Sequence, residues 1–304
     1  MAHSSTLPTD AGHTARVGPR ARSRWSYFWR VLRRNVPALL SLGFILLLIV
    51  VTVFAPLLAP YSPSVVSPSA SFRAPTWAHP FGTDMFGRDI LSRVIYGTRL
   101  SLLVGVLAVA IGAAGGTFLG MLAGVSARGV EQAIMRTIDV ALAFPFILLA
   151  ILILAFFGQG IQNVMIAVGI AYMPRFARIT HASTLSLREM EFVAAARASG
   201  AGTGRVMLRH ILPNLQQVLT VYGTFSIPIA ILIEAGLDYL GLGVLPPTPT
   251  WGAIINEGRQ SLLMAPWESV LPGLVIMGAV LAFNLFGEAV ANFLDPKAGI
   301  GLNR

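Results

Sequence analysis

Long runs of apolar residues alternate with short polar segments along most of the chain. Six of these runs hold about 20 residues each, the length that an α-helix needs to cross the hydrocarbon core of a bilayer. The pattern therefore predicts an all-α polytopic membrane protein with about six transmembrane helices. We expect these spans at residues 37–58, 100–125, 138–157, 161–179, 214–235 and 269–293.

The composition agrees with a membrane protein. Of the 304 residues, 55% are hydrophobic and only 12% are charged, whereas a soluble domain usually carries about 25% charged residues. The net charge is +9, and Lys297 is the only lysine. Basic loop residues fix the orientation of a membrane protein, and their distribution favours a cytoplasmic location for both termini. We therefore expect lipid around this chain and no nucleic-acid partner.

The ends of the chain differ from its apolar centre. Residues 1–35 are polar and basic, with Trp, Tyr and Phe close to the first span, and they predict a disordered or interfacial tail. Residues 36–98 would form the first span and an external elbow, residues 99–293 the main transmembrane domain, and residues 294–304 a short cytoplasmic tail. The first apolar run exceeds the about 7–15 residues of a signal peptide core, which predicts an uncleaved span.

Several kinds of chemistry have no matching residues. The chain has no cysteine, and Lys297 follows Pro296, so a Walker A phosphate loop is excluded. No HExxH or GxSxG motif and no clustered metal-ligand spacing occurs. We expect no catalytic residue, no metal site and no cofactor bound by this chain, which disfavours an intramembrane enzyme. His181 and His210 are expected to be ordinary polar loop residues.

Charged residues within the spans bear on the source of energy. Asp139, Glu234 and Glu288 are the candidates, and each is expected near the end of a span. A proton- or sodium-coupled carrier usually needs a charged or equivalent polar site near the midplane. An autonomous carrier or channel is therefore disfavoured, and energy for uphill transport would enter from another subunit.

A polar insert separates the fourth and fifth predicted spans. Residues 185–198 have the composition of a helix, and Gly200 suits its end because glycine accepts the left-handed conformation there. Thr203 can cap a second helix over residues 204–212, which Pro213 would stop or kink. The insert predicts a two-helix coupling knob on the cytoplasmic face, whose alanines let another protein approach closely. The alternative is a plain solvated loop that sets topology.

The coupling knob resembles the coupling segment of type I ABC importer permeases. That motif runs Glu-Ala-Ala, three residues, Gly and, after a further segment, Leu-Pro; here Ala194 stands where the family often has Glu, and His210 replaces an apolar residue. Residues 79–102, 239–259 and 281–296 are similar to the C-type permease of dipeptide, oligopeptide and nickel systems. The resemblance assigns the coupling role to Glu191, Ala194, Ala195, Ala196, Arg197, Gly200, Arg205, Leu212 and Pro213.

The resemblance implies a transport subunit with no enzymatic activity of its own. Such a subunit pairs with a sister permease, and the C-type likeness favours a distinct chain over a second copy. Two ATP-binding subunits, which carry ATP and Mg²⁺, would dock at the knobs, and an external binding protein would deliver the substrate. In a bacterial cytoplasmic membrane we expect di- or oligopeptides as substrate, with nickel or glutathione as alternatives.

The fifth predicted span carries a polar stripe. Gln217, Thr220 and Thr224 recur at three- or four-residue spacing and share one helical face, and Ser226 adds polarity nearby. Such a stripe either lines a water-filled path or bonds to neighbouring helices. We predict that these residues line the translocation path.

The second predicted span carries a repeat of small residues. Gly112, Gly116, Gly120 and Gly124 stand four residues apart. Small residues at this spacing let helices approach closely. The repeat predicts a packing ridge, either within the chain or toward a partner.

Two further segments flank the spans on the external side. Asp89 and Arg93 stand at i and i+4, which predicts an ion pair on an amphipathic helix before the second span. This helix would be an elbow or, less favoured, a contact for the binding protein. Residues 240–269 hold four prolines with Trp251 and Trp267, and predict an ordered external lid. That lid would be a gate, a docking surface or a structural re-entrant loop.

Overall fold

The computed structural model describes residues 35–294, and within them the chain is helical without a β-strand. This confirms the prediction of an all-α polytopic membrane protein. The predicted terminal tails lie almost wholly outside the described residues. The long helices are α2 (Val36–Val53), α4 (Ile90–Val125), α7 (Ile161–Arg188), α10 (Leu212–Tyr239) and α12 (Trp267–Leu294). The shorter ones are α3 (Ala55–Leu58), α5 (Arg128–Ala143), α6 (Phe146–Phe157), α8 (Glu191–Ala198), α9 (Thr203–Arg205) and α11 (Trp251–Gly258).

The number of straight spans is smaller than predicted. Four described helices are long and apolar enough to cross a membrane, or five if α5 and α6 count as one span bent by 101°. The predicted span 138–157 is therefore not one helix, because Phe144 and Pro145 break it and proline cannot continue the hydrogen-bonding pattern. Phe54 likewise divides the predicted first span into α2 and α3. In α7, Arg175 and Arg178 interrupt the apolar sequence.

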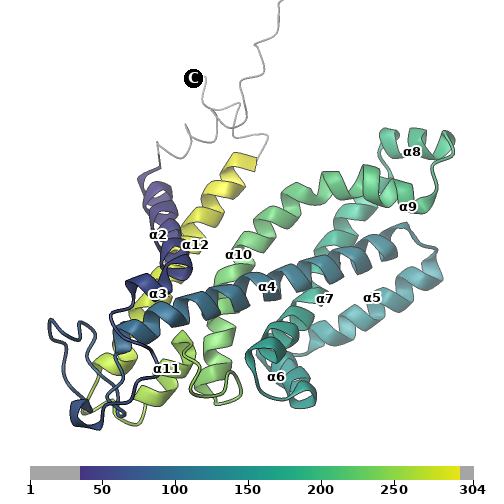
Figure 1. Ribbon diagram of the computed structural model, residues 1–304. Helices are drawn as coiled ribbons and strands as arrows, with labels where there is room; N and C mark the ends of the chain where they lie inside the picture. Colours follow the sequence, from purple (N-terminus) through teal and green to yellow (C-terminus); the bar gives the residue numbers. More distant parts are fainter. Residues whose placement is uncertain (1–34, 295–304) are drawn as a thin grey trace, which may run out of the picture.

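The helices form a bundle around α4 and α10 (Figure 1). α2 and α12 pack together on one side of this pair, while α5, α6 and α7 lie on the other. α8 protrudes at one end of the bundle, the same end at which α2 begins and α12 finishes. α11 and the segment before α4 lie at the opposite end, which is called the α11 end below.

Glycines explain the close contact between α4 and α7. Gly112, Gly116, Gly120 and Gly124 are all buried and face α7. A Cβ atom on Gly116 would lie 2.5 Å from the carbonyl oxygen of Met173, and one on Gly120 would lie 2.4 Å from that of Ala177. Because these neighbours are backbone atoms, they cannot rotate away, and the packing requires glycine at both positions.

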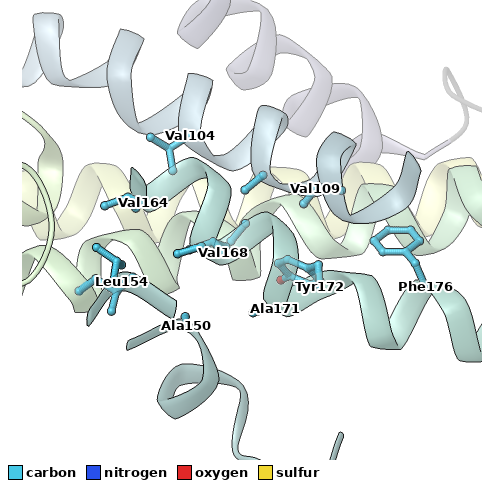
Figure 2. Close-up of a cluster of buried hydrophobic side chains, with 13 residues drawn as sticks. Val104, Val109, Ala150, Leu154, Val164, Val168, Ala171, Tyr172 and Phe176 are labelled. Carbon is cyan, nitrogen blue, oxygen red and sulfur yellow. The ribbon is translucent and has the colours of Figure 1, made fainter. Parts of the chain in front are cut away.

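The main core lies between α4, α6 and α7, with α10 closing one side. Figure 2 shows its buried side chains, which come mainly from three helices and interdigitate without polar groups apart from the Tyr172 hydroxyl. That hydroxyl donates a hydrogen bond to the carbonyl oxygen of Ser226 in α10, at 3.1 Å. The members labelled in the figure are Val104, Val109, Ala150, Leu154, Val164, Val168, Ala171, Tyr172 and Phe176.

The predicted ion pair between Asp89 and Arg93 is wrong. The Asp89 carboxylate caps α4 instead, accepting hydrogen bonds from the Ser92 amide at 2.8 Å and the Ser92 hydroxyl at 2.7 Å. It also contacts Nδ1 of His79 at 2.9 Å. A carboxylate at a helix N-terminus satisfies unpaired amides, so Asp89 is turned toward the helix end and away from Arg93. The elbow and the second span form one continuous helix.

A buried charge network holds the α11 end together. Arg93 is fully buried, and its Nη1 lies 2.7 Å from Oδ2 of Asp84 and 2.6 Å from Oε2 of Glu257, while its Nη2 lies 3.0 Å from Oε1 of Glu257. Arg88 contacts the same two carboxylates. Burial would raise the pKa of Glu257, but the hydrogen bonds and charges of Arg93 and Arg88 outweigh it and hold that pKa below its ordinary value.

A second polar cluster joins α10 to α4 and α11. The Ser101 hydroxyl lies 3.4 Å from Oε1 of the buried Glu234 and accepts a hydrogen bond from the Trp251 amide at 3.3 Å. Asp238 accepts hydrogen bonds from the Thr250 hydroxyl and from the backbone amide of Val244, in the loop that follows α10. The predicted external lid is therefore an ordered structure built around α11, with Trp251 fully buried.

Candidate functional site

The first helix of the coupling knob is shorter than predicted. α7 continues through Arg188 without a break, and α8 begins only at Glu191. Met190, in an extended conformation, separates the two helices. Residues 185–187 belong to the end of α7, where Leu187 packs on the core that anchors the knob.

Gly200 follows the end of α8 in the left-handed conformation that the sequence predicts. Its φ angle is +81°, and its amide donates to the carbonyl oxygen of Arg197 at 2.9 Å. The Ala201 amide donates to the carbonyl oxygen of Ala196 at 3.0 Å. These two bonds form a Schellman cap, which needs a residue that tolerates the left-handed region. The space around Gly200 is open, so the requirement is for its backbone conformation.

The second helix of the knob is the beginning of α10. Thr203 is the first residue of α9 and makes no capping hydrogen bond, so the predicted cap is wrong. Pro213 does not stop the helix, which continues to Tyr239, and of the two predicted effects the stop is wrong. Residues Val206–Ile211 form a π-helical turn that connects α9 to α10. A wide turn accommodates the missing N–H of Pro213, and the side-chain amide of Asn214 donates to the carbonyl oxygen of His210 at 2.6 Å.

One buried side chain anchors α8 to the bundle. Val193 is fully buried in a small core that includes Met121 of α4. The other buried members come from the π-helical turn and the beginning of α10: Val206, Met207, Ile211 and Leu215. Because α4 and α10 both contribute, a displacement of α8 would act on two central helices at once.

The remaining knob residues lie on or near the surface. Glu191, Ala194, Ala195, Arg197, Gly200, Arg205 and Pro213 are exposed, while Ala196 and Leu212 are half-buried. Three large apolar side chains are exposed beside them: Met190 at 50%, Phe192 at 41% and Leu208 at 65%. Sequence reasoning passed over these three, although Phe192 stands out between Glu191 and the alanines.

Polar contacts fix the end of α7 beneath the knob. Nη1 of Arg188 donates to the carbonyl oxygen of Gly124, the last glycine of the α4 ridge, at 2.9 Å. Two helical turns before the end of α7, Nε2 of His181 lies 2.9 Å from Oε1 of Glu131 in α5. His181 is thus a helix residue that pairs with α5, and the expectation of a loop residue is wrong.

The predicted path residues do not all share one face of α10. Thr224 and Ser226 donate to carbonyl oxygens of their own helix, those of Thr220 and Tyr222, both at 2.8 Å. Gln217 is exposed and donates to the carbonyl oxygen of Leu294 at 2.6 Å. Ser226 is buried against α7. It follows Gln217 by nine residues and Thr220 by six, and neither spacing is close to a whole number of turns at 3.6 residues per turn, so Ser226 lies on a different face of α10.

Among residues 35–294 there is no group of three or more His, Cys, Asp or Glu side chains that could hold a metal ion.

Comparisons with known proteins identify the family. Residues 116–300 match the binding-protein-dependent transport system inner membrane component, and residues 23–75 match the N-terminal transmembrane domain of oligopeptide transport permease C. The chain is 43% identical over 277 residues to the dipeptide transport system permease protein DppC of Alkalihalophilus pseudofirmus, covering 91% of each chain. It is 46% identical over 279 residues to the glutathione transport system permease protein GsiD of Escherichia coli O6:K15:H31, covering 91% of this chain and 92% of the relative.

A solved structure shows the same fold. A chain of the inward-facing MetNI methionine ABC transporter, native crystal form, superposes with a TM-score of 0.55 at 16% identity, covering 68% of this chain and 98% of that one. The matches in sequence and fold confirm the resemblance that the knob and the flanking blocks suggest. This chain therefore belongs to the family of binding-protein-dependent transport system inner membrane components, as a C-type permease subunit of an ABC importer.

Proposed function

We propose that this chain forms half of the translocation path of an ATP-driven peptide importer in a bacterial cytoplasmic membrane. It pairs with a distinct sister permease, receives substrate from an external binding protein and couples to two ATP-binding subunits that carry ATP and Mg²⁺. The dipeptide and glutathione systems named for its relatives support short peptides as substrate, with glutathione as a member of that class. Nickel is the alternative that the C-type likeness leaves open.

The coupling knob is the observation that carries this proposal. The knob presents the small side chains of α8, exposed apolar groups and the exposed Arg197 and Arg205 on its outer side, while Val193 fixes the inner side of α8 to α4 and α10. Small residues allow close approach of a partner, exposed apolar groups give it area to bury, and arginines favour a partner of complementary charge. In this proposal the ATP-binding subunit binds α8. Its movement is transmitted to α4 and α10 by the small core that contains Val193.

Position 194 bears on how the knob would dock, because alanine stands there in place of the glutamate that is frequent in the family. Ala194 is exposed and cannot form a charged hydrogen bond with a partner. Phe192, two residues away, offers apolar surface. Docking in this chain would rest on the shape and apolar contacts of α8, with Glu191 as the nearest acidic side chain.

Replacing Gly200 with valine tests the coupling role. A β-branched residue in the left-handed region costs about 1–2 kcal/mol, and this strain would open the Schellman cap without a steric clash. We expect normal membrane insertion, but about tenfold less co-purified ATP-binding subunit and about tenfold slower uptake. Affinity purification from mild detergent and uptake by reconstituted vesicles measure the two effects.

Two matched variants separate the cap from general damage. Gly200→Asn should retain most of the association because asparagine tolerates the left-handed conformation. Gly204→Ala, at an open helical position of the same knob, should behave like the parent protein. Unchanged association and uptake in Gly200→Val would count against the docking role of the knob.

A further inference from the structure

Arg175 occupies an unusual place in the bundle. It lies in the middle third of the 28-residue helix α7 and is half-buried. Its guanidinium carbon stands 4.6 Å from the centre of the Phe146 ring, and the hydroxyls of Tyr172 and Tyr222 lie close enough to interact with its charge. An arginine in the middle of a helix that packs within a membrane protein is costly unless it faces the bundle interior or a water-filled cavity.

Arg175 has no carboxylate partner in the described part of the chain. The ion pairs within residues 35–294 do not include it. Arg178, three residues further along the same helix, is paired with Asp139 of α5, and the arginines at the α11 end share two carboxylates. Aromatic faces and phenol oxygens hold Arg175 in place but leave its charge uncompensated.

The break between α5 and α6 lies beside Arg175. Phe146, the ring under the guanidinium, is the first residue of α6 and directly follows the break at Phe144 and Pro145. Non-helical backbone at membrane depth is tolerated where it is covered by protein or lines a water-filled cavity. In secondary transporters, discontinuous helices commonly form the place where a solute binds. The break and the unpaired cation are independent observations that point to the same place.

We propose that Arg175 binds a carboxylate of the solute as it passes through this subunit. The planar guanidinium can form two parallel hydrogen bonds with a carboxylate, while Phe146 and Tyr222 orient it. Short peptides carry the required group at their C-terminus. This assignment rests on the proposed import function and deepens it, because it places a contact for the anionic end of the substrate in the permease itself.

Transport by the complete reconstituted complex provides the first test. The probe is the dipeptide Ala-Phe, with uptake measured in the presence of the binding protein and ATP. We expect Arg175→Gln to lower uptake about tenfold, as for the loss of a charge-assisted hydrogen bond, while the ATP-binding subunits still co-purify. Arg178→Gln removes the same charge one turn away and should transport like the parent. Arg175→Lys should retain part of the uptake, because it keeps the charge without the planar fork.

Thiol labelling provides a readout that needs no transport. The chain has no cysteine, so Val218→Cys would give its only thiol; Val218 is 40% exposed and lies one turn from Tyr222 on the same side of α10. The thiol would be treated with an anionic, sulfonate-bearing methanethiosulfonate and with a cationic, trimethylammonium-bearing one. The ratio of the anionic to the cationic reaction rate should be about fivefold higher with Arg175 than in the Arg175→Gln background, because nearby positive charge favours the anionic reagent. Arg175→Lys should keep this preference, which tests the charge even if the glutamine variant fails to assemble.

The outcomes separate this inference from the proposed function. If the parent complex shows no ATP-dependent uptake, the import function itself fails. If the parent transports Ala-Phe and Arg175→Gln transports it equally well, the carboxylate site is overturned and the import function stands. Failure of both thiol reagents to react, or a charge preference that does not depend on Arg175, would also overturn it.

Discussion

Gly116→Leu is expected to prevent this chain from accumulating as a folded protein. The first carbon of the new side chain would lie 2.5 Å from the carbonyl oxygen of Met173 and 2.5 Å from Cβ of Phe176. Excess volume in a packed core costs about 1–3 kcal/mol where neighbours can rearrange, and more is expected here because the opposing atom belongs to the α7 backbone. Gly116→Ala should show a smaller loss in the same direction.

Yield of monodisperse protein and thermal unfolding in detergent measure this effect. Gly273→Leu is the matched control, since it lies within helix α12 and a Cβ atom there meets nothing within 4 Å. The control should unfold within a few degrees of the parent protein. Equal melting temperatures for Gly116→Leu and Gly273→Leu would contradict the close packing of α4 on α7.

Arg93→Met is expected to cause the second largest loss of stability. The substitution leaves Asp84 with Arg88 alone and removes the bidentate contact to Glu257. Removing one partner of a buried ion pair costs about 3–5 kcal/mol, because the remaining charge stays buried without compensation. Since Arg93 joins α4 to α11 and to the segment before α4, we expect the α11 end to open before the rest of the bundle.

Limited proteolysis and thermal unfolding would detect this opening. Arg73→Met is the control, because Arg73 lies in the same segment and its Nη2 makes only an exposed hydrogen bond to the carbonyl oxygen of Ser69, at 3.1 Å. A surface substitution of this kind changes stability by about 0.5 kcal/mol or less. If Arg93→Met and Arg73→Met are equally stable, the buried network contributes little to the fold.

Some features could be predicted from the sequence because they depend on local spacing. Apolar run length indicated the helical membrane architecture, and the four-residue spacing of glycines indicated a packing ridge. The left-handed conformation of Gly200 follows from its place after an alanine-rich helix. Each of these signals lies within a few helical turns of sequence.

Other features depend on partners that are distant in sequence. Glu257 stands 164 residues from Arg93, so local spacing could only suggest Asp89 as its partner. The second helix of the knob runs into α10 because Pro213 follows a π-helical turn, which no residue type marks. Arg175 lies near the end of the predicted span 161–179, and its aromatic neighbours Phe146 and Tyr222 come from other helices, so no local pattern marks it.

The central claim is that motion of an ATP-binding subunit reaches the path through the coupling knob. The most direct measurement is ATP-dependent uptake of Ala-Phe by vesicles that contain this permease, its sister permease, the ATP-binding subunits and the binding protein. We predict uptake with ATP, loss of uptake when the ATP-binding subunits are omitted, and about tenfold slower uptake with Gly200→Val. Uptake by the permease pair alone, without ATP-binding subunits, would contradict this account.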